Sequence, residues 1–123
     1  MNYQGFGKND IYYLSSDTQL DLDGDNNVDL DGKKLPPDVY GKATFENLQN
    51  AVKDVTSEDV KIKDLVVYLV DHGGNGTFRM NEDSEVLSAA ALNKALEELQ
   101  AKISGTMIIV YDACHSGSFI PAL

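Results

Sequence analysis

The chain has 123 residues, of which 42 % are hydrophobic and 24 % charged, an ordinary composition for one globular domain. Its 20 acidic residues outnumber its 10 basic ones and give a net charge of −10, which argues against nucleic acid and anionic membrane surfaces as partners. No apolar run is long enough to span a membrane, and a single cysteine excludes an internal disulfide.

The N-terminal half predicts one strand and one helix separated by a long loop. Residues 10–14 are rich in β-forming side chains and predict a first strand. Residues 15–37 are dense in Asp, Asn and Gly and show no apolar periodicity, which is typical of a loop. Thr44 can then cap a helix that ends near residue 55, because the apolar residues after it recur on one face.

The C-terminal half predicts two buried strands, a hairpin and a second helix. The unbroken apolar run over residues 65–70 is typical of a strand covered on both faces. Residues 77–80 and 85–87 flank a polar turn and predict a hairpin, after which Ser88 can cap a helix that ends near residue 102. A last strand follows over residues 107–110. Strands that alternate with helices predict an α/β fold with a mainly parallel central sheet.

Two short motifs follow the two apolar strands. His72-Gly-Gly comes after the first, and Asp112-Ala-Cys-His-Ser-Gly comes at the end of the second. Ligands of such sheets bind beyond the carboxyl ends of the strands, so we expect His72 and Cys114 to meet there and work together. An imidazole can hold the proton of a thiol nucleophile, and the N–H groups of Gly73 and Cys114 are candidate donors to an oxyanion.

Either residue alone has a commoner interpretation. A single cysteine after an apolar strand is usually only buried, and a single histidine is usually structural. A zinc site formed by Cys114, His72 and His115 would lack a fourth ligand. The occurrence of both residues at strand ends, each in a glycine-rich motif, favours a catalytic dyad, with His115 as a surface residue.

These motifs resemble those of the caspase-like clan (clan CD) of cysteine peptidases, which includes caspases, metacaspases and legumains. His72 and Cys114 are 42 residues apart (114 − 72 = 42), near the roughly 50 expected for caspases. The predicted hairpin after His-Gly-Gly-x-Gly and the string Asp-Ala-Cys-His-Ser-Gly-Ser favour the legumain-like, peptidase C13 branch. The resemblance implies a caspase/hemoglobinase-like three-layer sandwich, which we expect to be truncated at both ends in this chain.

The resemblance also implies roles for individual residues. His72 and Cys114 would form the catalytic dyad, and Gly73 would help to bind the oxyanion. Asp112 would line the pocket for the substrate side chain before the scissile bond, where a carboxylate suits Arg, Lys or the amide of Asn. The alternative for Asp112 is a capping residue that orders the loop after the strand.

The expected activity is that of a cysteine endopeptidase, which hydrolyses peptide or protein substrates through an acyl-enzyme and needs no catalytic cofactor. A transamidase, in which an amine replaces the water, would use the same dyad. A different class of function is a non-catalytic, calcium-binding module of a larger extracellular bacterial protein, and an extracellular or cell-envelope location is expected. An exposed sheet edge could pair with a second copy to form a homodimer.

An acidic loop over residues 21–32 places oxygen-bearing side chains at alternate positions: Asp21, Asp23, Asp25, Asn27 and Asp29. Such side chains can converge on one Ca²⁺ ion. The loop departs from an EF-hand because Asn26 stands where glycine is usual and Gly32 where a glutamate would close the site. The alternative is a solvated acidic loop, and a calcium titration of the melting temperature distinguishes the two.

Overall fold

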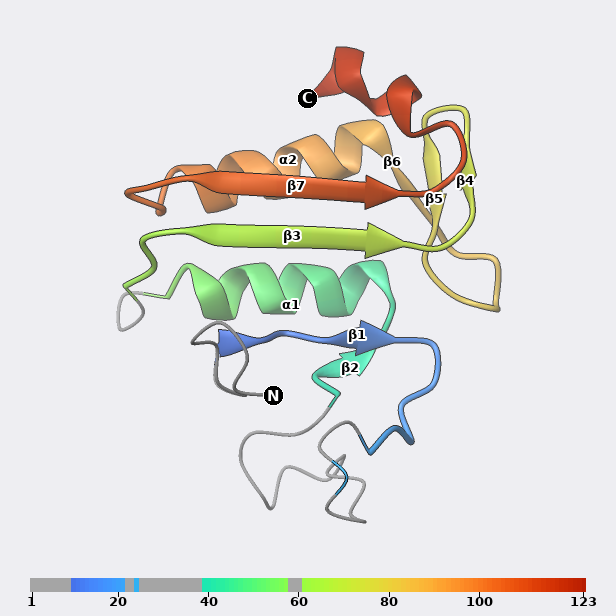
Figure 1. Ribbon diagram of the computed structural model, residues 1–123, viewed down its shortest axis with the longest axis horizontal. Coiled ribbons are helices and arrows are strands. Elements are labelled where there is room, and N and C mark those ends of the chain that lie inside the picture. The colour runs from blue at the N-terminus through green and yellow to red at the C-terminus, as the bar shows by residue number, and fades with distance from the viewer. Residues whose placement is uncertain (1–9, 22–23, 25–38, 58–60) are drawn as a thin grey trace.

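The protein has a mixed α/β fold, shown in Figure 1. The computed structural model describes residues 10–21, 24, 39–57 and 61–123. In chain order the elements are β1 (Leu14–Ser15), β2 (Gly41–Lys42), α1 (Phe45–Val55), β3 (Leu65–Val70), β4 (Gly73–Gly74), β5 (Thr77–Arg79), β6 (Val86–Ser88), α2 (Ala89–Gln100), β7 (Met107–Asp112) and the 3-10 helix η3 (Ser116–Ala122). Within these residues, no helix is long and apolar enough to cross a membrane.

Both α-helices begin at the predicted caps. The Thr44 hydroxyl accepts a hydrogen bond from the N–H of Asn47 at 3.1 Å, and the Ser88 hydroxyl accepts one from the N–H of Ala91 at 3.2 Å. Each cap satisfies a backbone donor that the first helical turn leaves unpaired, which stabilises a helix by about 1 kcal/mol. Helix α2 ends at Gln100, two residues before the predicted end.

Strands β3 and β7 form a parallel pair, as the alternation of strands and helices predicted. The pairing runs from Leu65 opposite Met107 to Val70 opposite Asp112. Because the pairing has no offset, the two strands end at the same edge of the sheet, as Figure 1 shows. The segments that follow β3 and β7 therefore start side by side.

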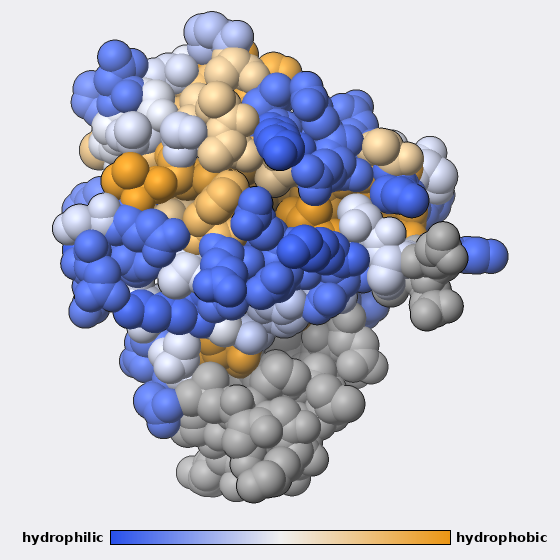
Figure 2. All heavy atoms as spheres, turned by 180° about the vertical axis from the view of Figure 1, so that it is seen from behind, coloured by the Kyte–Doolittle hydropathy of each residue, from blue (hydrophilic) through white to orange (hydrophobic). Residues whose placement is uncertain are grey.

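One face of this pair packs into the hydrophobic core. Leu65, Val67 and Leu69 of β3 and the matching residues of β7 contact a cluster built from both helices, the hairpin and η3. The most buried apolar side chains of that cluster are Leu87, Leu92 and Phe119, each 1 % exposed. Figure 2 shows the side opposite to Figure 1, where hydrophilic residues form a broad band with apolar residues gathered beside it.

The other face of the pair, called the outer face below, is exposed. It carries the side chains Val66, Tyr68, Val70, Ile108 and Val110. The prediction that the strand over residues 65–70, here β3, is covered on both faces is wrong for the described part of the chain, since Val66 and Val70 are 53 % and 59 % exposed. An unbroken apolar run does not alternate in polarity, so the sequence could not show that one face lacks a cover. The three-layer sandwich is accordingly not confirmed.

The first strand is shorter than predicted and lies outside the pair that forms the central sheet. β1 covers only Leu14–Ser15 and pairs in parallel with β2, in a small sheet separate from β3 and β7. Among the described residues, β3 and β7 therefore each have one unpaired edge. Dimerisation through such an edge stays a prediction.

The predicted hairpin is confirmed and has a third strand. β5 and β6 pair antiparallel, and β4 (Gly73–Gly74) pairs with the opposite edge of β5. Sequence reasoning missed β4 because two glycines carry no strand propensity. The antiparallel pairing places the glycines that follow His72 beside Thr77 and Phe78.

A buried asparagine joins the hairpin to the start of α1. Asn81 is 2 % exposed, and its Nδ2 donates to the carbonyl oxygen of Ala43 at 2.9 Å and to Glu85 Oε2 at 3.0 Å. Glu85 Oε1 in turn accepts a hydrogen bond from the N–H of Phe45 at 2.8 Å. This network satisfies polar groups away from water and fixes the hairpin against the core.

Candidate active site

The candidate site lies where β3 and β7 end. Val70 and Asp112 are the last paired residues, and His72 and Cys114 each follow two residues later. Both side chains are exposed, and Cys114 is a free thiol. The alignment of the two strands therefore brings these segments, 42 residues apart in the sequence (114 − 72 = 42), to one edge of the sheet.

Gly73 packs directly against the backbone of Cys114. A methyl group at Gly73 would lie 2.0 Å from the carbonyl oxygen of Cys114 and 3.1 Å from the Cβ of Ala113. Any side chain there would collide with the cysteine loop, so only glycine fits this approach. The structure thus places Gly73 and Cys114 in contact, while their catalytic roles stay predictions.

The backbone of His72 is held on both sides. Its N–H donates to Asp71 Oδ1 at 2.5 Å, and its carbonyl oxygen accepts from the N–H of Arg79 at 2.9 Å. The second bond ties the histidine to the hairpin, which is itself fixed to α1. The backbone of His72 is therefore held in part by a residue outside the His72-Gly-Gly motif.

Ser118 connects the loops that carry His72 and Cys114. Its Oγ accepts a hydrogen bond from the N–H of Gly76 at 2.8 Å and donates to the carbonyl oxygen of His115 at 2.6 Å. His115 itself is exposed, as predicted, and adopts a left-handed backbone conformation with φ 57°. From the sequence, Ser118 is only a small residue of the motif beside the thiol, and its bond to Gly76 appears only in the folded chain.

Asp112 points to the outer face of the sheet, where it meets Tyr68. The phenol of Tyr68 donates a hydrogen bond to Asp112 Oδ2 at 3.2 Å. This bond and the charge of Asp112 raise the pKa of Tyr68, since both favour the neutral phenol. Tyr68 was not predicted as a site residue. Its two-residue spacing from Val70 already placed it on this face, but nothing in the sequence indicated the bond to Asp112.

Aromatic rings pack together next to the loop that follows β7. The ring centroid of Tyr111 lies 4.6 Å from that of Phe119 and 5.5 Å from that of Phe78. Burial raises the pKa of Tyr111. Phe119 thus anchors η3, which follows the cysteine loop, in the hydrophobic core.

The acidic loop lies mostly outside the described residues. Asp21 is described and accepts a hydrogen bond from the N–H of Gly24 at 2.6 Å, whereas Asp23, Asp25, Asn27 and Asp29 are not. Across the part of the chain that the structure describes, no group of three or more His, Cys, Asp or Glu residues could hold a metal ion. Calcium binding by the loop therefore stays a prediction.

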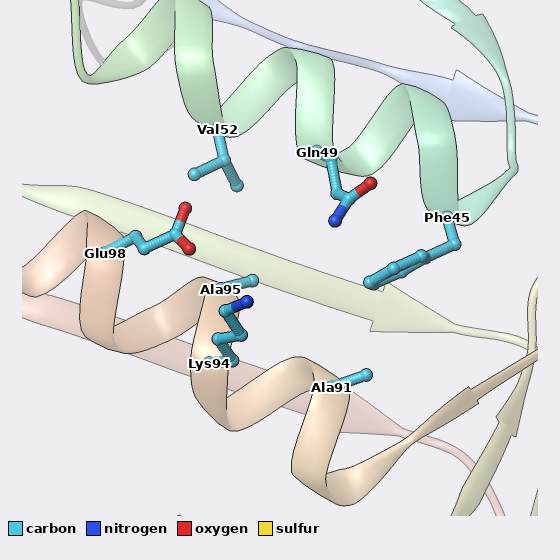
Figure 3. Close-up of a pocket in the computed structure, with 7 residues that line it drawn as sticks. All are labelled: Phe45, Gln49, Val52, Ala91, Lys94, Ala95 and Glu98. Atoms are coloured by element: carbon cyan, nitrogen blue, oxygen red, sulfur yellow. The ribbon is translucent and has the colours of Figure 1, made fainter.

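A small groove lies between the two α-helices, away from the residues discussed above. Figure 3 shows the side chains of α1 facing those of α2 across it: Phe45, Gln49, Val52, Ala91, Lys94, Ala95 and Glu98. None of the predicted site residues lines the groove. It brings together one lysine and one glutamate but no cysteine, serine or histidine, so it does not compete with the strand ends as the candidate active site.

The fold and the site define an α/β protein that presents a histidine-glycine pair and an exposed cysteine at adjacent strand ends. A family model described as the peptidase C13 family matches residues 19–123. The chain therefore belongs to the peptidase C13 family, and the resemblance to its legumain-like members is confirmed. No curated protein and no solved structure matches the chain.

Proposed function

We propose that the protein is a cysteine endopeptidase that uses Cys114 as its nucleophile and His72 as its acid and base. Membership of a peptidase family supports the reaction class. The observation that carries the assignment of residues is the packing of Gly73 against the Cys114 carbonyl, because it joins the two motifs in one site. The thiol is exposed, so a peptide can reach it.

In the proposed reaction, Cys114 Sγ attacks the carbonyl carbon of the scissile peptide bond after giving up its proton to His72. The N–H groups of Gly73 and Cys114 donate hydrogen bonds to the oxyanion that forms. His72 then passes the proton to the leaving amine, and a thioester remains on Cys114. A water molecule, deprotonated by His72, attacks the thioester, and the proton returns to the thiolate as the carboxylic acid leaves.

We also propose that the domain follows the caspase-like three-layer sandwich of this clan. The support is the apolar outer face, since in such a sandwich a second layer of helices covers that side of the sheet. An experimental structure of the whole protein in which Val66, Val70 and Ile108 remain in contact with solvent would contradict this arrangement.

The experiment that tests the proposed function is covalent labelling by a peptide. A peptidyl acyloxymethyl ketone with lysine next to its reactive carbon should form one adduct at Cys114, detected by mass spectrometry of the intact protein. The Cys114→Ala variant should form none, because the chain has no other cysteine. Iodoacetamide serves as the control for access to the thiol. Alkylation by iodoacetamide without labelling by this peptide or by its arginine and asparagine counterparts would refute a peptidase site.

Asp112 is proposed to select the substrate side chain before the scissile bond. Its carboxylate is exposed and lies just before the cysteine loop, where it can pair with a cationic or amide group. The isosteric variant Asp112→Asn removes the charge and should lower kcat/KM for a substrate with Lys or Arg at this position by about 10- to 100-fold.

The matched control for this substitution is a substrate with Asn at the same position, for which the loss should be much smaller. The comparison is made as a ratio of kcat/KM values, so that any loss of folded protein cancels. An equal loss for both substrates would show that Asp112 orders the loop and does not contact the side chain.

A further inference from the structure

We propose that Ser118 is a positioning residue that sets the geometry between His72 and Cys114. This inference rests on the proposed function, because it assigns Ser118 to the same site. Ser118 touches neither side chain of the dyad in the proposed reaction. It acts through the two backbone segments that carry them, and one hydroxyl group makes the connection.

The hydroxyl bonds to both segments at once. Oγ accepts from the N–H of Gly76 at 2.8 Å, four residues after His72, and donates to the carbonyl oxygen of His115 at 2.6 Å, next to Cys114. The carbonyl oxygen of Gly74 lies 3.4 Å from the same Oγ. Ser118 therefore spans the distance between the β4–β5 turn and the cysteine loop with both its donor and its acceptor functions in use.

Both segments turn sharply at the residues that Ser118 binds. Gly76 has φ +66° and His115 has φ 57°, so each sits in the left-handed region. His115 also precedes η3 without a side-chain cap of its own. Its carbonyl oxygen is instead bonded by the N–H of Ser118 at 2.9 Å as well as by Oγ. Ser118 therefore closes the first turn of η3, directly after the cysteine loop.

The consequence for chemistry is a change in distance between thiol and imidazole. Without the hydroxyl, the N–H of Gly76 loses its partner in a partly buried place, and the two loops lose a hydrogen bond that joins them. A displacement of about 1 Å in a catalytic pair can cost about 100-fold in rate. The packing of Gly73 on Cys114 sets how closely the loops approach, while Ser118 sets their lateral position.

The test compares Ser118→Ala with Ser116→Ala. Both variants delete a half-buried serine hydroxyl from η3, but only that of Ser118 bonds to the hairpin. The readout is the rate of Cys114 alkylation by iodoacetamide from pH 4 to pH 10, which needs no turnover, together with kcat and KM. We expect Ser118→Ala to lower kcat by about 10- to 100-fold with little change in KM. It should also move the alkylation profile towards that of His72→Ala, while Ser116→Ala stays near the wild type.

Two further variants at Ser118 distinguish a positioning role from a simple loss of folding. Ser118→Thr keeps the hydroxyl, whereas Ser118→Val has nearly the same volume as threonine but no hydroxyl. Thr should retain the wild-type alkylation profile, and Val should show the profile of Ser118→Ala. A merely structural role would lower the melting temperature of the Val variant and leave its profile unchanged, and that result would overturn the inference.

The reference variant His72→Ala separates the two ways in which the inference can fail. A changed profile for His72→Ala with an unchanged one for folded Ser118→Ala or Ser118→Val overturns the role of Ser118 and leaves the dyad standing. An unchanged profile for His72→Ala shows that the histidine does not act on the thiol. That result would overturn both the proposed function and the inference.

Discussion

Replacing His72 with alanine is expected to lower kcat for a peptide substrate by about 1,000-fold, the usual order for losing a general acid–base in covalent catalysis. The imidazole holds the proton that leaves Cys114 and returns it to the amine, so its loss slows acylation itself. KM should change little, because the imidazole does not bind the substrate side chain. Steady-state hydrolysis of a fluorogenic peptide measures both constants. The exposed position of His72 predicts that the free energy of unfolding stays within about 0.5 kcal/mol of the wild type.

Two controls make this result specific. The chain has one other histidine, His115, whose side chain is exposed. His115→Asn tolerates the left-handed backbone there and should change kcat by no more than about twofold. The double variant of His72 and Cys114 should be no slower than Cys114→Ala alone, because the two residues act as one unit. Additive losses in the double variant, or an equal loss in His115→Asn, would contradict a dyad of His72 and Cys114.

The sequence predicted the parts of the fold that local signals encode. Thr44 and Ser88 are helix caps, and each satisfies a backbone donor within three residues along the chain. Two apolar runs predicted β3 and β7, and the alternation of strands with helices along the chain predicted their parallel pairing. The pairing of β1 with β2 and the exposure of the outer face could not be predicted, because the residues of a strand do not show which strand pairs with it or which face stays uncovered.

The same division holds at the candidate site. His72 and Cys114 could be named from the sequence because a strand followed by a polar residue and glycine marks the edge where ligands bind. The hydrogen bonds of Ser118 and Tyr68 could not be predicted, since each joins residues that are 42 or 44 positions apart in the sequence. The residues that bear the proposed chemistry can therefore be identified from short sequence motifs. The hydrogen bonds that hold them in place can be identified only from the three-dimensional structure.

Gly73→Ala should damage both the stability and the activity of the protein. The added methyl group would lie 2.0 Å from the carbonyl oxygen of Cys114, and backbone cannot yield as a flexible side chain does. Forcing the two loops apart should lower the free energy of unfolding by about 1–3 kcal/mol. The loops also carry His72 and Cys114, so kcat should fall by about 100-fold or more in the protein that remains folded. Denaturant unfolding and peptide hydrolysis measure the two effects.

Two further variants separate local displacement from general destabilisation. Gly117→Ala adds the same methyl group in η3, where it meets nothing within 4 Å, and should change neither quantity much. Ser88→Ala removes the cap of α2 and should cost about 1 kcal/mol of stability while it leaves kcat near the wild-type value. If Ser88→Ala lost activity in proportion to its stability, the loss in Gly73→Ala would need no special geometry. If Gly73→Ala alone lost activity beyond its loss of stability, the contact between Gly73 and Cys114 would be what aligns the thiol with the imidazole.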